Sequence, residues 1–151
     1  MSWVKKGLII EPKNNKWWMR SHAMLPTVFF LKDNLYRIYY SGRDINGISH
    51  IGYSDVEIQG DNIMEIMKSN EPVLSPGERG CFDDNGVTPS CIVGDKFYYI
   101  GWNSGTTTYR MSLIMGLALV TKDSKLERYS RAPLLPKTDR EPFGICTAPF
   151  V

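Results

Sequence analysis

A repeated order of short segments constrains the fold of this chain more than any other feature. Residues 25–29 (LPTVF) and 88–92 (TPSCI) each set a proline before apolar residues, and the prolines at 26, 89 and 149 lie 63 and 60 residues apart. A fixed period of this kind is typical of folds built from repeated supersecondary units. The spacing predicts two complete units and the opening of a third at residues 147–151.

Within each unit the segments follow one order. Residues 35–40 (LYRIYY) and 96–102 (KFYYIGW) are aromatic segments that follow polar turns, as hairpins require. A segment rich in small and apolar residues with one glycine comes next, and a Pro-Val-Leu or Pro-Leu-Leu segment closes the unit at 71–76 and 132–136. Four short antiparallel strands make one propeller blade. The order predicts an all-β partial propeller, with an ordinary β-sandwich as the alternative.

The period also predicts the boundaries of the units. We expect blade one at 21–80, blade two at 81–140 and the start of blade three at 141–151. Aromatics at 12 %, with 13 glycines and 9 prolines, favour strands and turns over helices. The best helical candidate is residues 61–68 (DNIMEIMK), which would make about two turns.

Charge and cysteine content argue against several classes of protein. Lysine and arginine number 18 against 16 acidic residues, so no one-sided basic field favours nucleic acid. Cys81, Cys91 and Cys146 form neither a disulfide framework nor a zinc motif, and we expect no cofactor and no metal. The short apolar run near the N-terminus is neither a signal peptide nor a membrane span, which predicts a soluble cytoplasmic protein with no membrane partner.

Several motifs together resemble a known family. They are residues 17–27 (WWMRSHAMLPT), 36–44 (YRIYYSGRD), 80–90 (GCFDDNGVTPS), 98–103 (YYIGWN) and 141–142 (EP). The chain resembles the N-terminal half of a bacterial family of glycosidase-like five-bladed propellers, often met in polysaccharide-biosynthesis clusters. That family is similar in fold to the arabinanase, levansucrase and invertase group, including glycoside hydrolase family 43, and to the β-mannoside phosphorylases.

The resemblance implies a five-bladed ring, of which this chain would supply about two and a half blades of four antiparallel strands. Residues 1–20 would then provide a latch strand, at 7–10, to the last blade. The related enzymes usually carry a carboxylate beside the first-strand proline, where this chain has Leu25, Thr88 and Ala148. The departure argues against the usual hydrolase triad in this half, and the chain alone is expected to be inactive.

Blade geometry places a set of polar residues together. The first strand of a blade lines the channel, and the second strand ends at the face where the first begins. Residues before first strands and after second strands should therefore meet at one mouth. The residues expected there are Arg20, Ser21, His22, Ser41, Arg43, Asp44, Asp83, Asp84, Asn85, Trp102, Asn103, Ser104 and Glu141.

Three of these residues are catalytic candidates. Glycosidic cleavage needs one carboxyl group as acid and a second as base or nucleophile. We expect Asp84 to point inward, Asp83 to brace the turn, and Glu141 to face Asp84 from the next blade boundary. Alternatively, Asp83 and Asp84 belong to an ordinary turn, and Glu141 is a solvated loop residue.

The predicted substrate-binding residues are Arg20, His22, Arg43, Asp44, Trp102 and Asn103. Arginines with a histidine suit a phosphate or sugar hydroxyls, and an indole suits a sugar face. The alternatives are a histidine bonded to the channel rim and a salt bridge between neighbouring Arg43 and Asp44. Trp17, Trp18 and Tyr109 are expected to pack in the core rather than bind sugar.

Two functions remain open from the sequence. The first is a carbohydrate-active enzyme, hydrolase or phosphorylase, acting on glycosidic bonds in glycan metabolism. The alternative is a non-catalytic carbohydrate-binding or scaffold propeller of a polysaccharide biosynthesis system. A protein-interaction propeller fits less well, because its repeats are usually about 40–50 residues long. The expected partner is a carbohydrate or sugar-phosphate ligand, and unpaired blade edges predict self-association.

Overall fold

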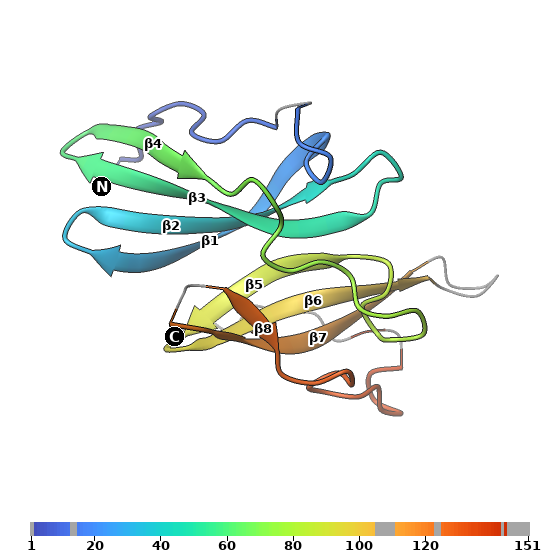
Figure 1. Cartoon of the computed structure of the whole chain (residues 1–151). Helices are drawn as coiled ribbons and strands as arrows, with labels where there is room; N and C mark the ends of the chain where they lie inside the picture. The colour runs from blue at the N-terminus through green and yellow to red at the C-terminus, as the bar shows by residue number, and fades with distance from the viewer. Residues whose placement is uncertain (1, 13–14, 105–110, 123–124, 143, 145–151) are drawn as a thin grey trace.

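Two four-stranded antiparallel sheets make up the computed structural model, which describes residues 2–12, 15–104, 111–122, 125–142 and 144 (Figure 1). The first sheet contains β1 (Ser21–Lys32), β2 (Leu35–Arg43), β3 (Ser49–Gln59) and β4 (Asn62–Lys68), and the second contains β5 (Val87–Val93), β6 (Lys96–Ser104), β7 (Met111–Val120) and β8 (Leu126–Arg128). In each sheet the strands lie side by side in chain order. The described residues form no helix, and the all-β prediction is confirmed.

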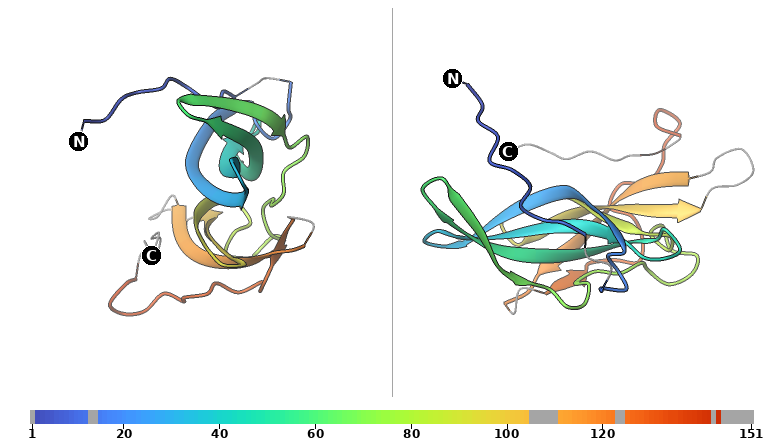
Figure 2. Two further views of the ribbon diagram at one scale, coloured as in Figure 1. Left: turned by 90° about the vertical axis from the view of Figure 1, so that its left-hand side faces the viewer. Right: turned by 90° about the horizontal axis from the view of Figure 1, so that it is seen from above.

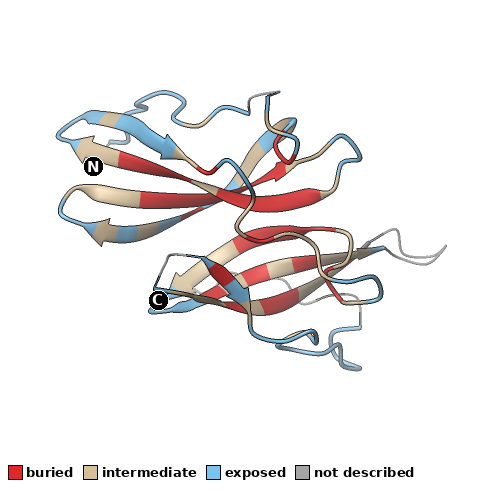
Figure 3. Ribbon diagram, in the orientation of Figure 1, coloured by how far each residue is buried: buried red, intermediate tan, exposed pale blue. Residues whose placement is uncertain are grey.

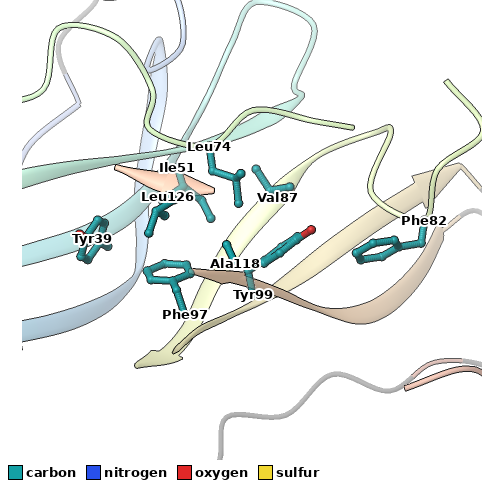
Figure 4. Packing of buried hydrophobic residues seen from close by; sticks show 9 residues of the cluster. All are labelled: Tyr39, Ile51, Leu74, Phe82, Val87, Phe97, Tyr99, Ala118 and Leu126. Atoms are coloured by element: carbon teal, nitrogen blue, oxygen red, sulfur yellow. The ribbon is translucent and has the colours of Figure 1, made fainter. Parts of the chain in front are cut away.

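The two sheets are stacked, as both views in Figure 2 show, with a shared core between them. Tyr39 from β2 and Phe97 from β6 meet edge to face across the interface, with ring centroids 5.0 Å apart. Figure 4 shows them with residues from both sheets and from the linker between the sheets. On β1, Thr27 donates a hydrogen bond from Oγ1 to the carbonyl of Ser90 on β5, at 3.2 Å. The first strands of the two sheets are therefore neighbours.

The sequence repeat reappears in the strand register. Tyr40 lies opposite Gly52 in the first sheet, and Tyr99 lies opposite Gly116 in the second. A Cβ at Gly52 would lie 2.0 Å from the Trp18 ring, and one at Gly116 would lie 2.4 Å from the Tyr99 ring. The two glycines occupy equivalent positions in the two sheets. A larger residue does not fit at either position, because an aromatic ring lies against the backbone there. Burial follows the same pattern, because the middle strands are largely covered and β4 is largely exposed (Figure 3).

The helical candidate at 61–68 is wrong, because these residues form β4. Ile63 pairs with Ile58 of β3, and the hairpin turns at Gly60, whose φ of 59° suits a left-handed turn position. A two-turn helix in isolation is marginal. Hydrogen bonding of residues 62–68 to β3 outweighs their weak helical pattern.

The closing Pro-Val-Leu segments are not the fourth strands that the sequence predicts. Leu74 forms a single bridge with Ile51 of β3, and the N–H of Leu134 donates to the carbonyl of Met115 of β7 at 2.9 Å. Each segment therefore crosses back to the third strand of its own sheet. The fourth places belong to β4 and β8.

Residues 2–12 run along the first sheet and form no strand. Lys6 makes an ion pair with Asp61 at 2.8 Å, and Lys68 donates to the carbonyl of Glu11 at 3.4 Å. Residues 7–10 pair with no described strand. The latch predicted for them pairs with the last blade of the ring, so it stays a prediction. The predicted third unit at 147–151 lies outside the described residues, as do Tyr109 and Cys146. No helix capable of crossing a bilayer occurs in the described part of the chain.

Candidate functional site

The start of β1 and the end of β2 lie together, as the sequence predicts. Ser21 pairs with Arg43, and the N–H of Arg20 donates to the carbonyl of Arg43 at 2.8 Å. The second sheet repeats this arrangement, because the N–H of Trp102 donates to the carbonyl of Gly86 at 2.8 Å. We call this end of the two sheets, residues 20–22, 43–50, 83–87 and 102–104, the mouth.

One contact joins the two halves of the mouth. Ser49, the first residue of β3, forms a parallel bridge with Gly86, the residue before β5. Gly86 has a φ of 144°, and a Cβ there would lie 2.6 Å from the Ser49 hydroxyl. Only glycine permits this approach. The turn after β2 and the turn before β5 therefore lie side by side.

Asp84 is a half-buried carboxylate held by two donors. Its Oδ2 accepts the N–H of Gly80 at 2.8 Å, and its Oδ1 accepts the side-chain amide of Asn103 at 2.8 Å. Asn103 also donates to the carbonyl of Cys81 at 3.0 Å. The predicted site residues Asp84 and Asn103 are thus in direct contact, and the amide fixes the direction of the carboxylate.

A cleft of about 490 Å³ opens beside this pair. Cys81 and Asn103 line one part of it, and Arg131, Pro133 and Lys137 line another. The lining combines an amide, two cations and apolar surface. Such a mixture suits a polar ligand with apolar faces.

The side chain of Asp83 is buried in the interior, although its backbone belongs to the mouth. Its side chain is 0 % exposed, and its Oδ2 lies 2.8 Å from Nη2 of Arg128 and 2.9 Å from the hydroxyl of Tyr99. Burial raises the pKa of Tyr99, which remains a neutral donor to the carboxylate. This position fits the bracing role that the sequence suggests for Asp83.

Asp44 is engaged by its own turn. Its Oδ1 accepts the N–H groups of Asn46 and Ile48 at 2.9 Å each, and its Oδ2 lies 3.6 Å from Nε2 of His50. Asp44 and Arg43 are both described, and no ion pair joins them. The salt bridge that sequence adjacency suggests is not formed, because the Asx turn directs the carboxylate back into the loop.

Arg43 keeps a buried Nε–H that has no acceptor among the described residues. Arg20 and His22 are exposed beside it, and His22 has a φ of 63° with its Nδ1 2.8 Å from the Ser21 hydroxyl. Two arginines and a histidine therefore lie at the mouth end of the first sheet, with Arg20 and His22 exposed.

The remaining predicted residues are more dispersed. Trp102 is half-buried, and its indole N–H donates to the Thr88 hydroxyl at 3.1 Å. Glu141 is exposed, and its backbone N–H donates to the carbonyl of Thr138 at 3.0 Å. Its carboxylate makes no hydrogen bond or ion pair with any described residue, so the structure does not bring it into contact with Asp84. Trp18 is fully buried in the core, as expected. The same expectation is wrong for Trp17, which is exposed and whose indole N–H donates to Glu71 at 2.8 Å.

His50 is a mouth residue that the sequence reasoning missed. It opens β3 beside Ser49, its Nδ1 lies 3.1 Å from the Ser75 hydroxyl, and the Trp17 ring meets it edge-on at 4.9 Å. Burial lowers the pKa of His50, although the neighbouring Asp44 opposes that shift. The position of His50 at the mouth could have been predicted from the sequence, because third strands also begin at that end of a blade. In the described part of the chain, no group of three or more His, Cys, Asp or Glu side chains is arranged to hold a metal.

No family model matches the chain. Two curated proteins of Mycobacterium tuberculosis are similar to it, the uncharacterized protein MT1551 (strain CDC 1551 / Oshkosh) and the uncharacterized protein Rv1502 (strain ATCC 25618 / H37Rv). Each is 39 % identical over 150 residues, which cover 96 % of this chain and 49 % of the relative. The chain spans about half the length of the curated relatives it matches.

Two solved structures are similar in fold. One is named "Glycoside hydrolase", with a TM-score of 0.68 and 13 % identity over 87 % of this chain and 45 % of the solved one. The other is a BT0996 RGII complex, with a TM-score of 0.67 and 13 % identity over 86 % of this chain and 45 % of the solved one. At this identity the match concerns the fold alone. The two sheets therefore have the architecture of about half of a solved glycoside hydrolase.

Proposed function

We propose that this chain belongs to a glycosidase-like, carbohydrate-active protein that acts on glycosidic bonds in glycan metabolism, as hydrolase or phosphorylase. The proposal includes a five-bladed ring of the glycoside hydrolase family 43 type, to which these sheets contribute two blades. The observation that carries it is the Asp84–Asn103 pair at the mouth, beside the 490 Å³ cleft. The shared fold with a glycoside hydrolase supports it.

The hydrogen bonds of Asp84 favour a catalytic role in which its carboxyl group is ionised. Both carboxylate oxygens accept an N–H from Gly80 or Asn103, and neither bond requires a proton on the carboxyl group. An oriented carboxylate suits a base, a nucleophile or a stabiliser of the positive charge that develops on the sugar ring. We therefore assign Asp84 to the base or nucleophile side of the reaction.

A second carboxyl group has to supply the leaving-group proton. Such pairs lie about 5–5.5 Å apart in retaining enzymes and about 6.5–9.5 Å apart in inverting ones. Glu141 is our candidate for this acid, since its carboxylate is exposed and unengaged among the described residues. Asp83 is not proposed for chemistry, because Arg128 and Tyr99 already occupy its buried Oδ2.

One observation favours the alternative, a carbohydrate-binding protein without catalysis. Among the described mouth residues, Asp84 is the single carboxylate that is both half-exposed and free of an acidic or basic partner, since Asp44 lies against His50. One carboxylate is sufficient to accept hydrogen bonds from sugar hydroxyls. It is insufficient for the two-carboxylate mechanism.

The test uses the protein with all of its blades, since this chain alone is expected to be inactive. It measures saccharide binding, release of reducing ends and, with inorganic phosphate added, formation of sugar 1-phosphate, over a panel of oligosaccharides. We expect Asp84→Asn to abolish turnover and Asp95→Asn to leave it unchanged. Asp95 is an exposed carboxylate in the hairpin turn at the opposite end of the second sheet. Hydrolysis creates a new reducing end, whereas phosphorolysis transfers the sugar to phosphate and creates none, so phosphate-dependent formation of a sugar 1-phosphate identifies a phosphorylase.

Three results separate the readings. Turnover that survives Asp84→Asn contradicts the role of Asp84. Binding without turnover supports the non-catalytic alternative. A protein that neither binds nor cleaves any saccharide contradicts a carbohydrate function.

A further inference from the structure

We infer that Arg43 recognises an anionic group on the sugar, a carboxylate or a phosphate, at the mouth of the first sheet. The inference rests on the proposed carbohydrate function and names the substrate class of the same site. Its basis is the buried Nε–H of Arg43, which lacks an acceptor among the described residues.

Arg37, on the same strand β2, shows how a buried guanidinium group is paired in this protein. Arg37 donates to Asp55 from Nε at 2.7 Å and from Nη2 at 2.8 Å, with both side chains less than 10 % exposed. The pair satisfies the fork of the guanidinium within the sheet. Arg43 lies six residues further along β2, at the mouth, and no described carboxylate pairs with it in this way.

The neighbouring carboxylates are already engaged. Asp44 accepts two backbone N–H groups of its own turn, and its second oxygen faces His50. Asp84, from the turn beside it, accepts from Gly80 and Asn103. A buried donor without an acceptor is costly, so the position calls for an acceptor from outside these residues.

The surroundings favour a negatively charged acceptor. Arg20 lies next to Arg43, because its N–H donates to the Arg43 carbonyl at 2.8 Å, and its side chain is exposed. His22 follows at the start of β1. The planar guanidinium fork matches the oxygens of a carboxylate or a phosphate, and a neutral hydroxyl matches it less well.

The experiment titrates the protein with glucose, glucuronate, glucose 6-phosphate and inorganic phosphate, with binding measured by calorimetry. We expect the two anionic sugars to bind at least tenfold more tightly than glucose. Arg43→Met should remove that preference, and Arg43→Lys should restore part of it, because lysine keeps the charge and lacks the fork. The relative affinities of glucuronate and glucose 6-phosphate distinguish a carboxylate from a phosphate as the group recognised.

The matched control is Lys32→Met, which removes one positive charge from an exposed residue at the opposite end of β1. It should leave the preference unchanged, and the melting temperature of each variant shows whether it is folded. Equal binding of glucose and glucuronate, unaffected by Arg43→Met, overturns the inference and leaves the carbohydrate function standing. Binding of inorganic phosphate that Arg43→Met abolishes, with none of the three sugars bound, shows an anion site and contradicts the recognition of an anionic sugar by Arg43.

Discussion

The Oδ2 atom of Asp83 lies 2.8 Å from Nη2 of Arg128, and the carboxylate of the pair is completely buried. Asp83 belongs to the turn before β5, and Arg128 is the last residue of β8. Because β5 and β8 are the two edge strands, the ion pair connects opposite edges of the second sheet. Tyr99 on β6 donates to the same oxygen at 2.9 Å, and Arg128 also donates to the carbonyl of Ser75 at 2.8 Å. The pair therefore fixes the turn that presents Asp84.

Asp83→Asn should destabilise the protein by about 3 kcal/mol, because it removes the fully buried carboxylate that pairs with the half-buried Arg128 guanidinium. Denaturant unfolding followed by tryptophan fluorescence measures the change. The control is Glu78→Gln, which breaks an ion pair with Arg131 whose side chains are 73 % and 76 % exposed. An equal loss of stability in both variants would show that the Asp83 pair has no special structural role.

Gly52→Ala should destabilise the first sheet by about 1–3 kcal/mol or more, since the new methyl group would overlap the buried Trp18 ring. The emission of Trp18 should also change as the ring moves. Gly94→Asn is the comparison, because Gly94 has a φ of 61° and open space around it, and asparagine tolerates that conformation. Unchanged stability of Gly52→Ala would mean that Trp18 does not lie against this backbone.

His50 should make stability fall on mild acidification. Burial lowers its pKa below the ordinary value of about 6.5, so the unfolded chain takes up a proton before the native one does. Stability is then complete above pH 6.5 and declines as the pH falls through 6.5 towards the lower folded pKa, by at most about 1.4 kcal/mol per pH unit. His50→Gln should flatten the dependence between pH 7 and 5, whereas His22→Gln, at an exposed histidine, should preserve it.

Tyr40 should make stability fall at high pH. Burial raises its pKa to about 12, whereas the unfolded chain loses this proton near pH 10. Between these values the unfolded state holds fewer protons, so unfolding becomes easier as the pH rises. Tyr40→Phe should reduce the slope between pH 10 and 12, and an unchanged slope would contradict the burial of this hydroxyl against Ser54.

The repeat could be predicted from sequence because prolines, aromatics and glycines mark the same structural positions in both units. Tyr40 opposite Gly52 and Tyr99 opposite Gly116 are those positions in the structure. Residues 61–68 could not be assigned correctly, because their strand depends on pairing with β3 rather than on local preference. Nonlocal pairing outweighs weak local signals.

The meeting of the strand ends at the mouth could be predicted, because the start of one antiparallel strand lies beside the end of the next. The partners of its charges could not be predicted, since Asp83 and Arg128 are 45 residues apart and nothing in their local sequence links them. His50 was missed because the sequence reasoning considered first and second strands only. Arg43 was correctly placed at the mouth, although its lack of a carboxylate partner among the described residues appears only once Asp44 is seen to bind its own turn.

The most direct test of the carbohydrate site is a chemical-shift map of the protein during titration with a saccharide. The account predicts that the largest shifts occur at the mouth, in the backbone around Arg43 and Asp84, the side-chain amide of Asn103 and the indole N–H of Trp102. The hairpin turns at 32–35 and 93–96, at the opposite end of both sheets, should remain unchanged. Shifts confined to those turns, or no shifts with any saccharide, would contradict it.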